Sequence, residues 1–295
     1  MAQRDNMNRR SFFKQFAAAG LPVMAGITSS LKAAERGSRM RFGLVTYQWG
    51  RDWDLPTLIA NCETARVSGV ELRVDHQHGV SPKLTPTERV EVRKRFADSP
   101  VVCVGMGTNE DFHHADADLL KQRIENTKAW LRLSHDIGGS GVKVKPNDFA
   151  KGVAREVTIE QIGRSLNEVA RYGAELGQQI RLEVHGQCAE LPTIKAIMDV
   201  ADHPNATVCW NCNGQDLQGA GLVQNFNLVK NRFGATVHVR ELNLGDYPYQ
   251  ELMDLFVAMD YAGWILLEAR QDPPDRVKAL AEQREIFAKM IGQGG

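Results

Sequence analysis

Four side chains able to bind a metal or transfer protons recur at nearly constant intervals in the second half of the chain. Glu183, Asn211, His238 and Glu268 stand 28, 27 and 30 residues apart. Two carboxylates, an imidazole and an amide oxygen are donors suited to Mn²⁺, Mg²⁺, Co²⁺ or Zn²⁺. Structural ion pairs also use single residues of these types, so it is the shared spacing that favours one common site.

The interval between these residues matches one β-strand followed by one α-helix. Runs rich in Val, Ile and Leu predict strands at 41–48, 69–75, 100–106, 140–146, 179–185, 206–211, 235–241 and 263–269. Apolar residues at helical spacing predict helices at 55–67, 115–136, 158–176, 191–200, 223–232, 249–261 and 274–290. Thr158 is expected to cap the third of these helices.

Alternating strands and helices predict an α/β protein in which residues 40–295 form a (β/α)₈ TIM barrel. An open, doubly wound sheet is the alternative, but such a sheet normally carries a Gly-rich phosphate loop after its first strand. Here the first strand runs into Tyr47-Gln48-Trp49-Gly50. A barrel builds its active site at the carboxyl ends of the strands, so the four recurring residues are expected at one height around its mouth.

Other polar residues follow the predicted strands at the same end, where a small polar substrate would lie. An ion pair at the bottom of the barrel or a solvated loop is the alternative for the two lysines. The residues predicted to bind substrate are His76, His78, His113, His114, Lys143, Lys145, His185, Arg240 and Arg270.

Three short motifs resemble the xylose-isomerase-like TIM-barrel family of sugar phosphate isomerases and epimerases. They are Leu-Glu-Val-His-Gly around Glu183, Val-His-Val-Arg-Glu around His238 and Ile-Leu-Leu-Glu ending at Glu268. The resemblance covers the chain after its first residues and implies a divalent metal held by these three residues and Asn211. The family has Asp where this chain has Asn211, which removes one anionic ligand, and it has a later His for which Asn213 and Asp216 are the nearby substitutes.

The resemblance implies a small-molecule sugar substrate and proton transfer at the carbon beside its carbonyl. The metal would act as a Lewis acid that stabilises an enediolate, and Glu183 and Glu268 would be the acid and base. A sugar or keto-sugar isomerase or epimerase is the leading hypothesis. A lyase or hydratase that acts on 3-keto glycosides or inosose by β-elimination is the second, and a non-catalytic sugar-binding barrel is the third.

The first residues resemble an export signal. Asn8-Arg9-Arg10-Ser11-Phe12-Phe13-Lys14 is similar to the bacterial twin-arginine (Tat) signal, and a short apolar stretch follows it. We therefore expect residues 1–35 to be a Tat-type signal segment and the protein to be periplasmic. A basic amphipathic first helix is the alternative.

The composition limits the kinds of partner that we expect this protein to bind. The formal net charge is zero, which provides no electrostatic footprint for nucleic acid. No run of 18 apolar residues follows residue 40, so no stable membrane insertion is expected after processing. The five cysteines are an odd number, and Cys209-x-x-Cys212 has no second pair to complete a zinc site. A homo-oligomer is compatible with these features.

Replacing both Arg9 and Arg10 by Lys should retain the protein in the cytoplasm, because the paired arginines are the part of the signal that the export machinery reads. Fractionation of cells followed by immunoblotting would measure this. Undiminished periplasmic delivery of the double variant would contradict the export hypothesis.

Overall fold

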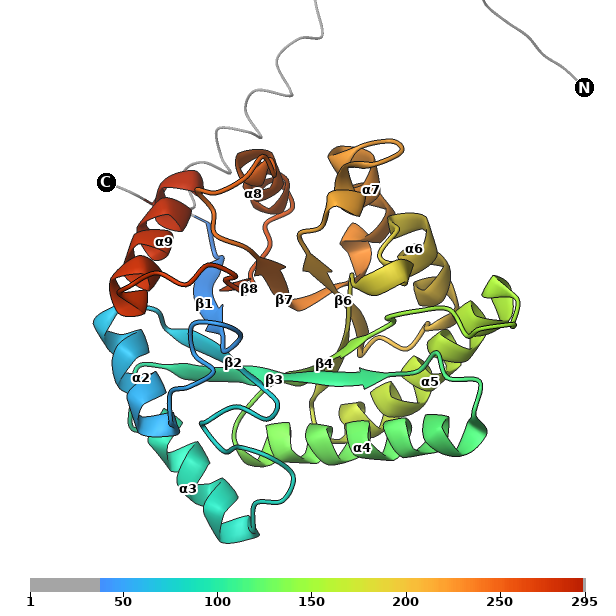
Figure 1. Ribbon diagram of the computed structural model, residues 1–295, viewed down its shortest axis with the longest axis horizontal. Coiled ribbons are helices and arrows are strands. Elements are labelled where there is room, and N and C mark those ends of the chain that lie inside the picture. The colour runs from blue at the N-terminus through green and yellow to red at the C-terminus, as the bar shows by residue number, and fades with distance from the viewer. Residues whose placement is uncertain (1–37, 294–295) are drawn as a thin grey trace, which may run out of the picture. The chain divides into compact units, whose positions relative to one another are not determined.

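Eight parallel strands close into one barrel in the computed structural model, which describes residues 38–293 (Figure 1). Each strand pairs with its neighbour in the sequence, and the first pairs with the last. This confirms the predicted TIM barrel, whereas the predicted export segment lies outside the described residues. The strands are β1 Arg41–Val45, β2 Gly69–Arg73, β3 Val102–Asp111, β4 Gly141–Lys145, β5 Gln179–Glu183, β6 Ala206–Asn211, β7 Phe233–Val239 and β8 Trp264–Leu267.

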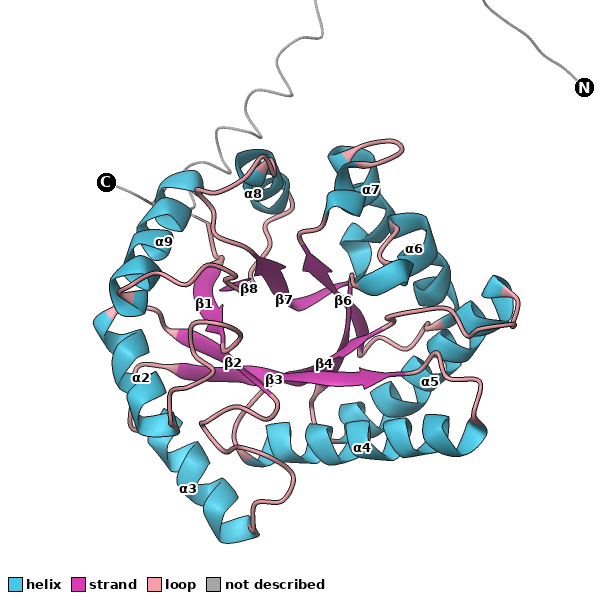
Figure 2. Ribbon diagram, in the orientation of Figure 1, coloured by secondary structure: helices cyan, strands magenta, loops and turns pink. Residues whose placement is uncertain are grey.

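An α-helix follows each strand and covers the outside of the barrel (Figure 2). Phe42 on β1, for example, stacks on Phe287 of the last helix with ring centroids 5.2 Å apart. Within residues 38–293, no helix combines the length and the apolar character needed to cross a bilayer. The helices are α2 Leu55–Thr64, α3 Pro86–Ala97, α4 Ala117–Asp136, α5 Arg155–Glu175, α6 Leu191–Val200, α7 Leu222–Val229, α8 Tyr249–Ala258 and α9 Arg276–Met290.

Helix α3 has no counterpart among the predicted helical segments. Only Val92 and Phe96 of its twelve residues are buried, so the helix has little of the apolar periodicity on which the other predictions rest. Its start carries a different signal. The Thr85 hydroxyl accepts from the backbone N–H of Glu88, and the Glu88 carboxylate accepts from the backbone N–H of Thr85, which together form a capping box.

Several element boundaries differ from the sequence-based expectation, and two of them bear on the site. Helix α5 begins at Arg155, and Thr158 lies inside it, where its hydroxyl accepts from the backbone N–H of Ala150. Strand β3 continues to Asp111, five residues beyond the predicted end. The extension is polar (Thr108-Asn109-Glu110-Asp111), so its composition is typical of a loop, although it pairs with β4 across a register shift.

Apolar side chains and the fully buried guanidinium of Arg181 occupy the lower part of the barrel interior. Val45, Val104, Trp264 and Leu266 form a cluster there, separate from the larger core between sheet and helices. Gly69 makes room for it, because a Cβ at that position would overlap the Trp264 ring. Side chains of one strand alternate between its two faces, so the interior residues that come next along the strands lie nearer the mouth.

All five cysteines are buried and free. Cys209 faces the Thr236 hydroxyl, whose oxygen lies 3.5 Å from its sulfur. Of the groups of metal-binding side chains within residues 38–293, none contains a cysteine.

Gly69→Ala should destabilise the barrel by about 1–3 kcal/mol, because the added methyl group overpacks the Trp264 ring at the barrel floor. Urea unfolding followed by circular dichroism would measure the loss. Gly214→Ala is the matched control, since a Cβ there meets no atom within 4 Å. Equal stabilities of the two variants would contradict this account of the floor.

Candidate active site

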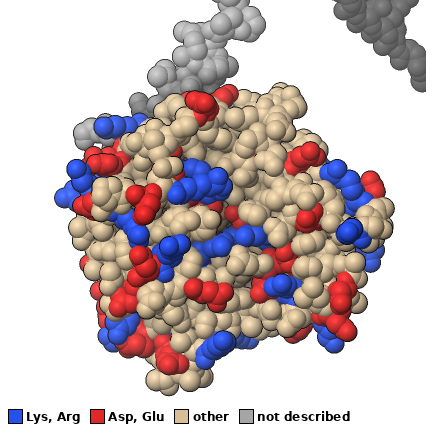
Figure 3. Space-filling view, in the orientation of Figure 1, with Lys and Arg blue, Asp and Glu red and all other residues tan. Residues whose placement is uncertain are grey.

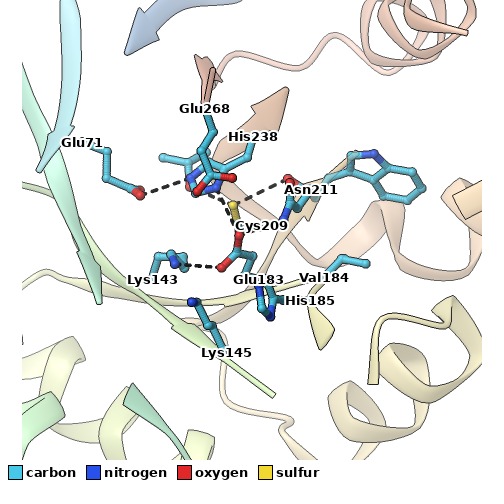
Figure 4. Close-up of polar contacts among 12 residues, drawn as sticks. Glu71, Lys143, Lys145, Glu183, Val184, His185, Cys209, Asn211, His238 and Glu268 are labelled. Carbon is cyan, nitrogen blue, oxygen red and sulfur yellow. Dashed lines mark hydrogen bonds and ion pairs between the residues drawn. The ribbon is translucent and has the colours of Figure 1, made fainter. Parts of the chain in front are cut away.

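The buried carboxylate of Glu183 stands at the centre of a polar cluster at the barrel mouth (Figure 4). The Lys143 ammonium on β4 lies 2.7 Å from Glu183 Oε2, and Asn211 Nδ2 on β6 donates to Glu183 Oε1 at 2.8 Å. All three side chains are at most 1% exposed. Strands β4, β5 and β6 are consecutive in the barrel, so their interior residues meet across one strand spacing.

His238 on β7 connects Glu183 with a second buried carboxylate. Its Nε2 lies 3.1 Å from Glu71 Oε1, and its Nδ1 lies 3.5 Å from Glu183 Oε1. Glu71 was not among the predicted site residues. The signal that could have identified it was a strand, buried along its whole length, in which the charged residues Glu71 and Arg73 alternate with apolar ones. A buried charge is costly unless it is paired.

Glu268 follows β8 two residues after Leu266 and faces the same interior. It pairs with the Arg240 guanidinium, which comes from the neighbouring end of β7. One donor atom each of Glu183, His238 and Glu268 lie within 4.8 Å of one another. The structure therefore brings together all four residues that the spacing singled out, because Asn211 contacts Glu183 directly.

Electrostatics in this cluster favour charged forms in spite of burial. Burial by itself would raise the pKa of Glu183, yet the Lys143 ammonium and then His238 hold it well below its usual range. Burial would lower the pKa of His238, but the Cys209 sulfur and the Glu71 carboxylate raise it well above its usual value. Without a metal ion the cluster is therefore an ionic network, and a metal ion that binds His238 would displace the proton of its imidazole.

The donor set fits a divalent metal ion. Asn211 Oδ1 and His238 Nδ1 are buried and have no hydrogen-bond partner among the described residues. Glu71 on the far side of the imidazole resembles the carboxylate that commonly orients a metal-binding histidine. Turning the Asn211 amide by half a turn would direct Oδ1 toward Glu183 and the site, since amide oxygen and nitrogen are nearly interchangeable in shape.

Several residues predicted to bind substrate surround this centre. Lys145 and His185 stand two residues beyond Lys143 and Glu183 on the same strand faces, and both are partly exposed. His185 Nδ1 lies 3.1 Å from Asn147 Oδ1. Their proposed contacts with substrate stay predictions.

The remaining predicted residues differ in their surroundings. Lys143 is fully buried, with its charge directed at Glu183. Both ring nitrogens of His78 contact the backbone of their own loop, at Arg73 O and Val80 N, so the ring braces that loop. His76 is partly buried near the Thr46 hydroxyl, and Arg270 is exposed.

His113 and His114 form a separate group with Asp111 at the end of β3. The Asp111 oxygens lie 2.6 Å from His114 Nε2 and 3.6 Å from His113 Nδ1, and the three side chains could together hold a metal. Arg123 Nε also lies 3.8 Å from Asp111 Oδ1. This group is less buried than the Glu183 cluster, and a cation lies near the carboxylates of both.

Asn213 and Asp216, the two nearby substitutes for the family's additional histidine, make hydrogen bonds within the turn after β6. Asn213 Nδ2 donates to Val184 O and Asn211 O, and Asp216 Oδ2 accepts from the Asn213 backbone and from the Tyr247 hydroxyl. Both side chains support the turn after β6, and Asp216 Oδ1 is buried without a hydrogen-bond partner among the described residues.

Comparison with known proteins agrees with this architecture. A family model described as "Xylose isomerase-like TIM barrel" matches residues 59–290. An L-ribulose 3-epimerase structure is similar with a TM-score of 0.73 at 16% identity, covering 86% of this chain and 95% of that one. A 3-keto-D-glucoside 4-epimerase from E. coli has a TM-score of 0.72 at 12% identity, covering 85% and 99%. A probable 3-DHS dehydratase from Bacillus anthracis has a TM-score of 0.68 at 13% identity, covering 84% and 99%. No curated protein matches by sequence.

Asn211→Asp should lower thermal stability without metal, because a second carboxylate would face Glu183 where an amide now donates a hydrogen bond. With Mn²⁺ or Zn²⁺ the same variant should bind metal more tightly than the unchanged protein, since added ligand charge strengthens such sites. Thermal unfolding and chelator-competition titration would measure both effects.

His238→Ala removes one of the proposed ligands. It should abolish metal binding both in the unchanged protein and in the Asn211→Asp variant. Unchanged metal affinity in both Asn211→Asp and His238→Ala would show that no metal binds at this cluster.

Proposed function

Because the chain belongs to the xylose isomerase-like TIM-barrel family, we propose that it is a keto-sugar isomerase or epimerase that transfers the proton beside the carbonyl. The observation that carries this proposal is the approach of Glu183, His238 and Glu268 at the barrel mouth, with donor atoms within 4.8 Å. Epimerases with the same fold, such as the L-ribulose 3-epimerase, support the proposal.

The two glutamates come from β5 and from the end of β8 and reach the site from different sides (Figure 4). A substrate carbon held between them would have one carboxylate on each face, so that one removes the proton and the other returns it. Return from the opposite face inverts the carbon, and return to the neighbouring carbon moves the carbonyl.

The cationic partners determine how the glutamates work. Lys143 and Asn211 hold both oxygens of Glu183, so this carboxylate has a fixed orientation and stays ionised. Arg240 holds Glu268 from one side. Ion pairing lowers the pKa of a carboxylate and so weakens it as a base. The substrate proton must therefore be made more acidic before these glutamates can remove it.

A divalent ion held by Glu183, Asn211, His238 and Glu268 would supply that help by polarising the substrate carbonyl, which makes the neighbouring proton more acidic. Lys143 would assist from beneath, because its buried ammonium adds positive charge where negative charge develops. We expect His185, at the edge of the cluster, to bind a substrate hydroxyl group.

Incubation with keto sugars in D₂O tests the proposal directly. We expect deuterium to enter at the carbon beside the carbonyl, observed by proton NMR, and Glu268→Gln or Glu183→Gln to slow this entry by about 10²–10⁴-fold. Glu175→Gln, an exposed position on α5, is the matched control and should exchange normally.

The same spectra separate the alternatives. Loss of a β-substituent with formation of a double bond would identify the lyase reaction. Binding without any exchange, in protein loaded with Mn²⁺, would overturn the proposed activity and favour a sugar-binding barrel.

A further inference from the structure

Two cations at the barrel mouth share one neutral oxygen. Arg73 ends β2 and Lys145 ends β4, while Asn109 lies on β3 between them. Arg73 Nη2 and Lys145 Nζ each lie 3.1 Å from Asn109 Oδ1. No carboxylate of residues 38–293 lies within 4.0 Å of either cationic group, the limit for an ion pair. An amide oxygen is therefore the hydrogen-bond acceptor for two positive charges.

Arg73 is a buried cation without a counter-charge among the described residues. It is only 9% exposed, and its Nε is buried without a hydrogen-bond partner. The guanidinium lies 5.6 Å from the centre of the Tyr47 ring, which provides a weak additional contact. Burying an unpaired charge is costly, and a buried charge is normally paired.

The fold makes space for this arrangement. A Cβ on Gly107 would lie 2.7 Å from Glu71 Oε1 and 3.1 Å from Arg73 Cδ, so the missing side chain lets both residues enter the barrel. Arg73 stands two residues after Glu71 on the same strand face, nearer the mouth. The pair of cations therefore lies directly above the ionic network of the active site.

Lys145 is partly exposed and lies beside Lys143 at the edge of that network (Figure 4). Burial, and then the nearby Lys143 ammonium, lower the pKa of Lys145 to about 8. Lys and Arg side chains also gather near the centre of the face that looks down the barrel (Figure 3). The local excess of positive charge contrasts with the zero net charge of the whole chain.

We propose that Arg73 and Lys145 bind an oxyanion carried by the substrate, so that the substrate is an anionic keto sugar with a carboxylate or a phosphate group. This inference rests on the proposed function for the position of the reacting carbons at Glu183 and Glu268. The planar guanidinium suits two oxygens of one anion, and the flexible ammonium adds a point charge. The anionic end of the substrate lies toward β2 and β4, and its carbonyl end lies toward β5 to β8.

Calorimetric titration of the full chain with three matched ligands tests the proposal: D-fructose, D-fructuronate and D-fructose 6-phosphate. At least one charged ligand should bind about tenfold or more tightly than fructose, and its affinity should fall as salt is added. The stronger charged ligand identifies carboxylate or phosphate as the natural group. Equal affinity for all three ligands would overturn the oxyanion site.

Arg73→Gln and Lys145→Gln should each weaken binding of the charged ligand by about tenfold to a hundredfold, with less than about a twofold effect on fructose. Lys121→Gln, an exposed position on α4, removes the same charge elsewhere and should have no effect. Arg73→Lys keeps the charge and should retain part of the affinity if Arg73→Gln does not fold. Equal losses for charged and neutral ligands would overturn the proposal.

The two proposals fail in different measurements. Selective binding of the charged ligand without deuterium exchange would overturn the proposed reaction and leave the oxyanion site. Exchange with no preference for charge would overturn the oxyanion site and leave the reaction.

Discussion

The buried ion pair between Lys143 and Glu183 is the interaction on which the rest of the site depends. Both side chains are at most 1% exposed, so both charges have lost nearly all of their hydration. Such a pair is tolerated only when the contact is close and the remaining polar atoms find partners. Asn211 supplies one of those partners to Glu183, and the backbone oxygen of Thr108 supplies one to Lys143. The pair therefore fixes the height and orientation of the central carboxylate.

Asn in place of Asp at position 211 follows from that constraint. An amide can donate a hydrogen bond to Glu183, whereas an aspartate there would add a second negative charge at the same carboxylate. The chain thus balances its charges with its own residues: Lys143 opposes Glu183, Arg240 opposes Glu268, and His238 lies against Glu71. An amide also keeps an oxygen that can turn toward a cation. Charge balance and metal binding are therefore compatible at this one position.

The fold was predictable where local pattern and tertiary packing agree. Strands buried on both faces are nearly continuous apolar runs, and the helices that cover them have one apolar face. The prediction failed where local pattern and tertiary packing disagree. Helix α3 has few buried residues, so its sequence resembles a solvated loop apart from the capping box at Thr85. The end of β3 is polar because it lines the mouth, and only its pairing with β4 makes it a strand.

The sequence alone determined the barrel and the positions of Glu183, Asn211, His238 and Glu268, because a repeating unit of constant length places its members at equal heights around a closed sheet. The sequence did not identify Glu71 or Arg73 as site residues. It left the role of Lys143 open between substrate binding, an ion pair and a solvated loop. Those assignments depend on which residues face each other across the barrel, and that is decided by its closure and by the register of strands far apart in the sequence. The partner that neutralises a buried charge is a property of three-dimensional proximity, so only the tertiary structure showed that Lys143 is paired and that Arg73 is not.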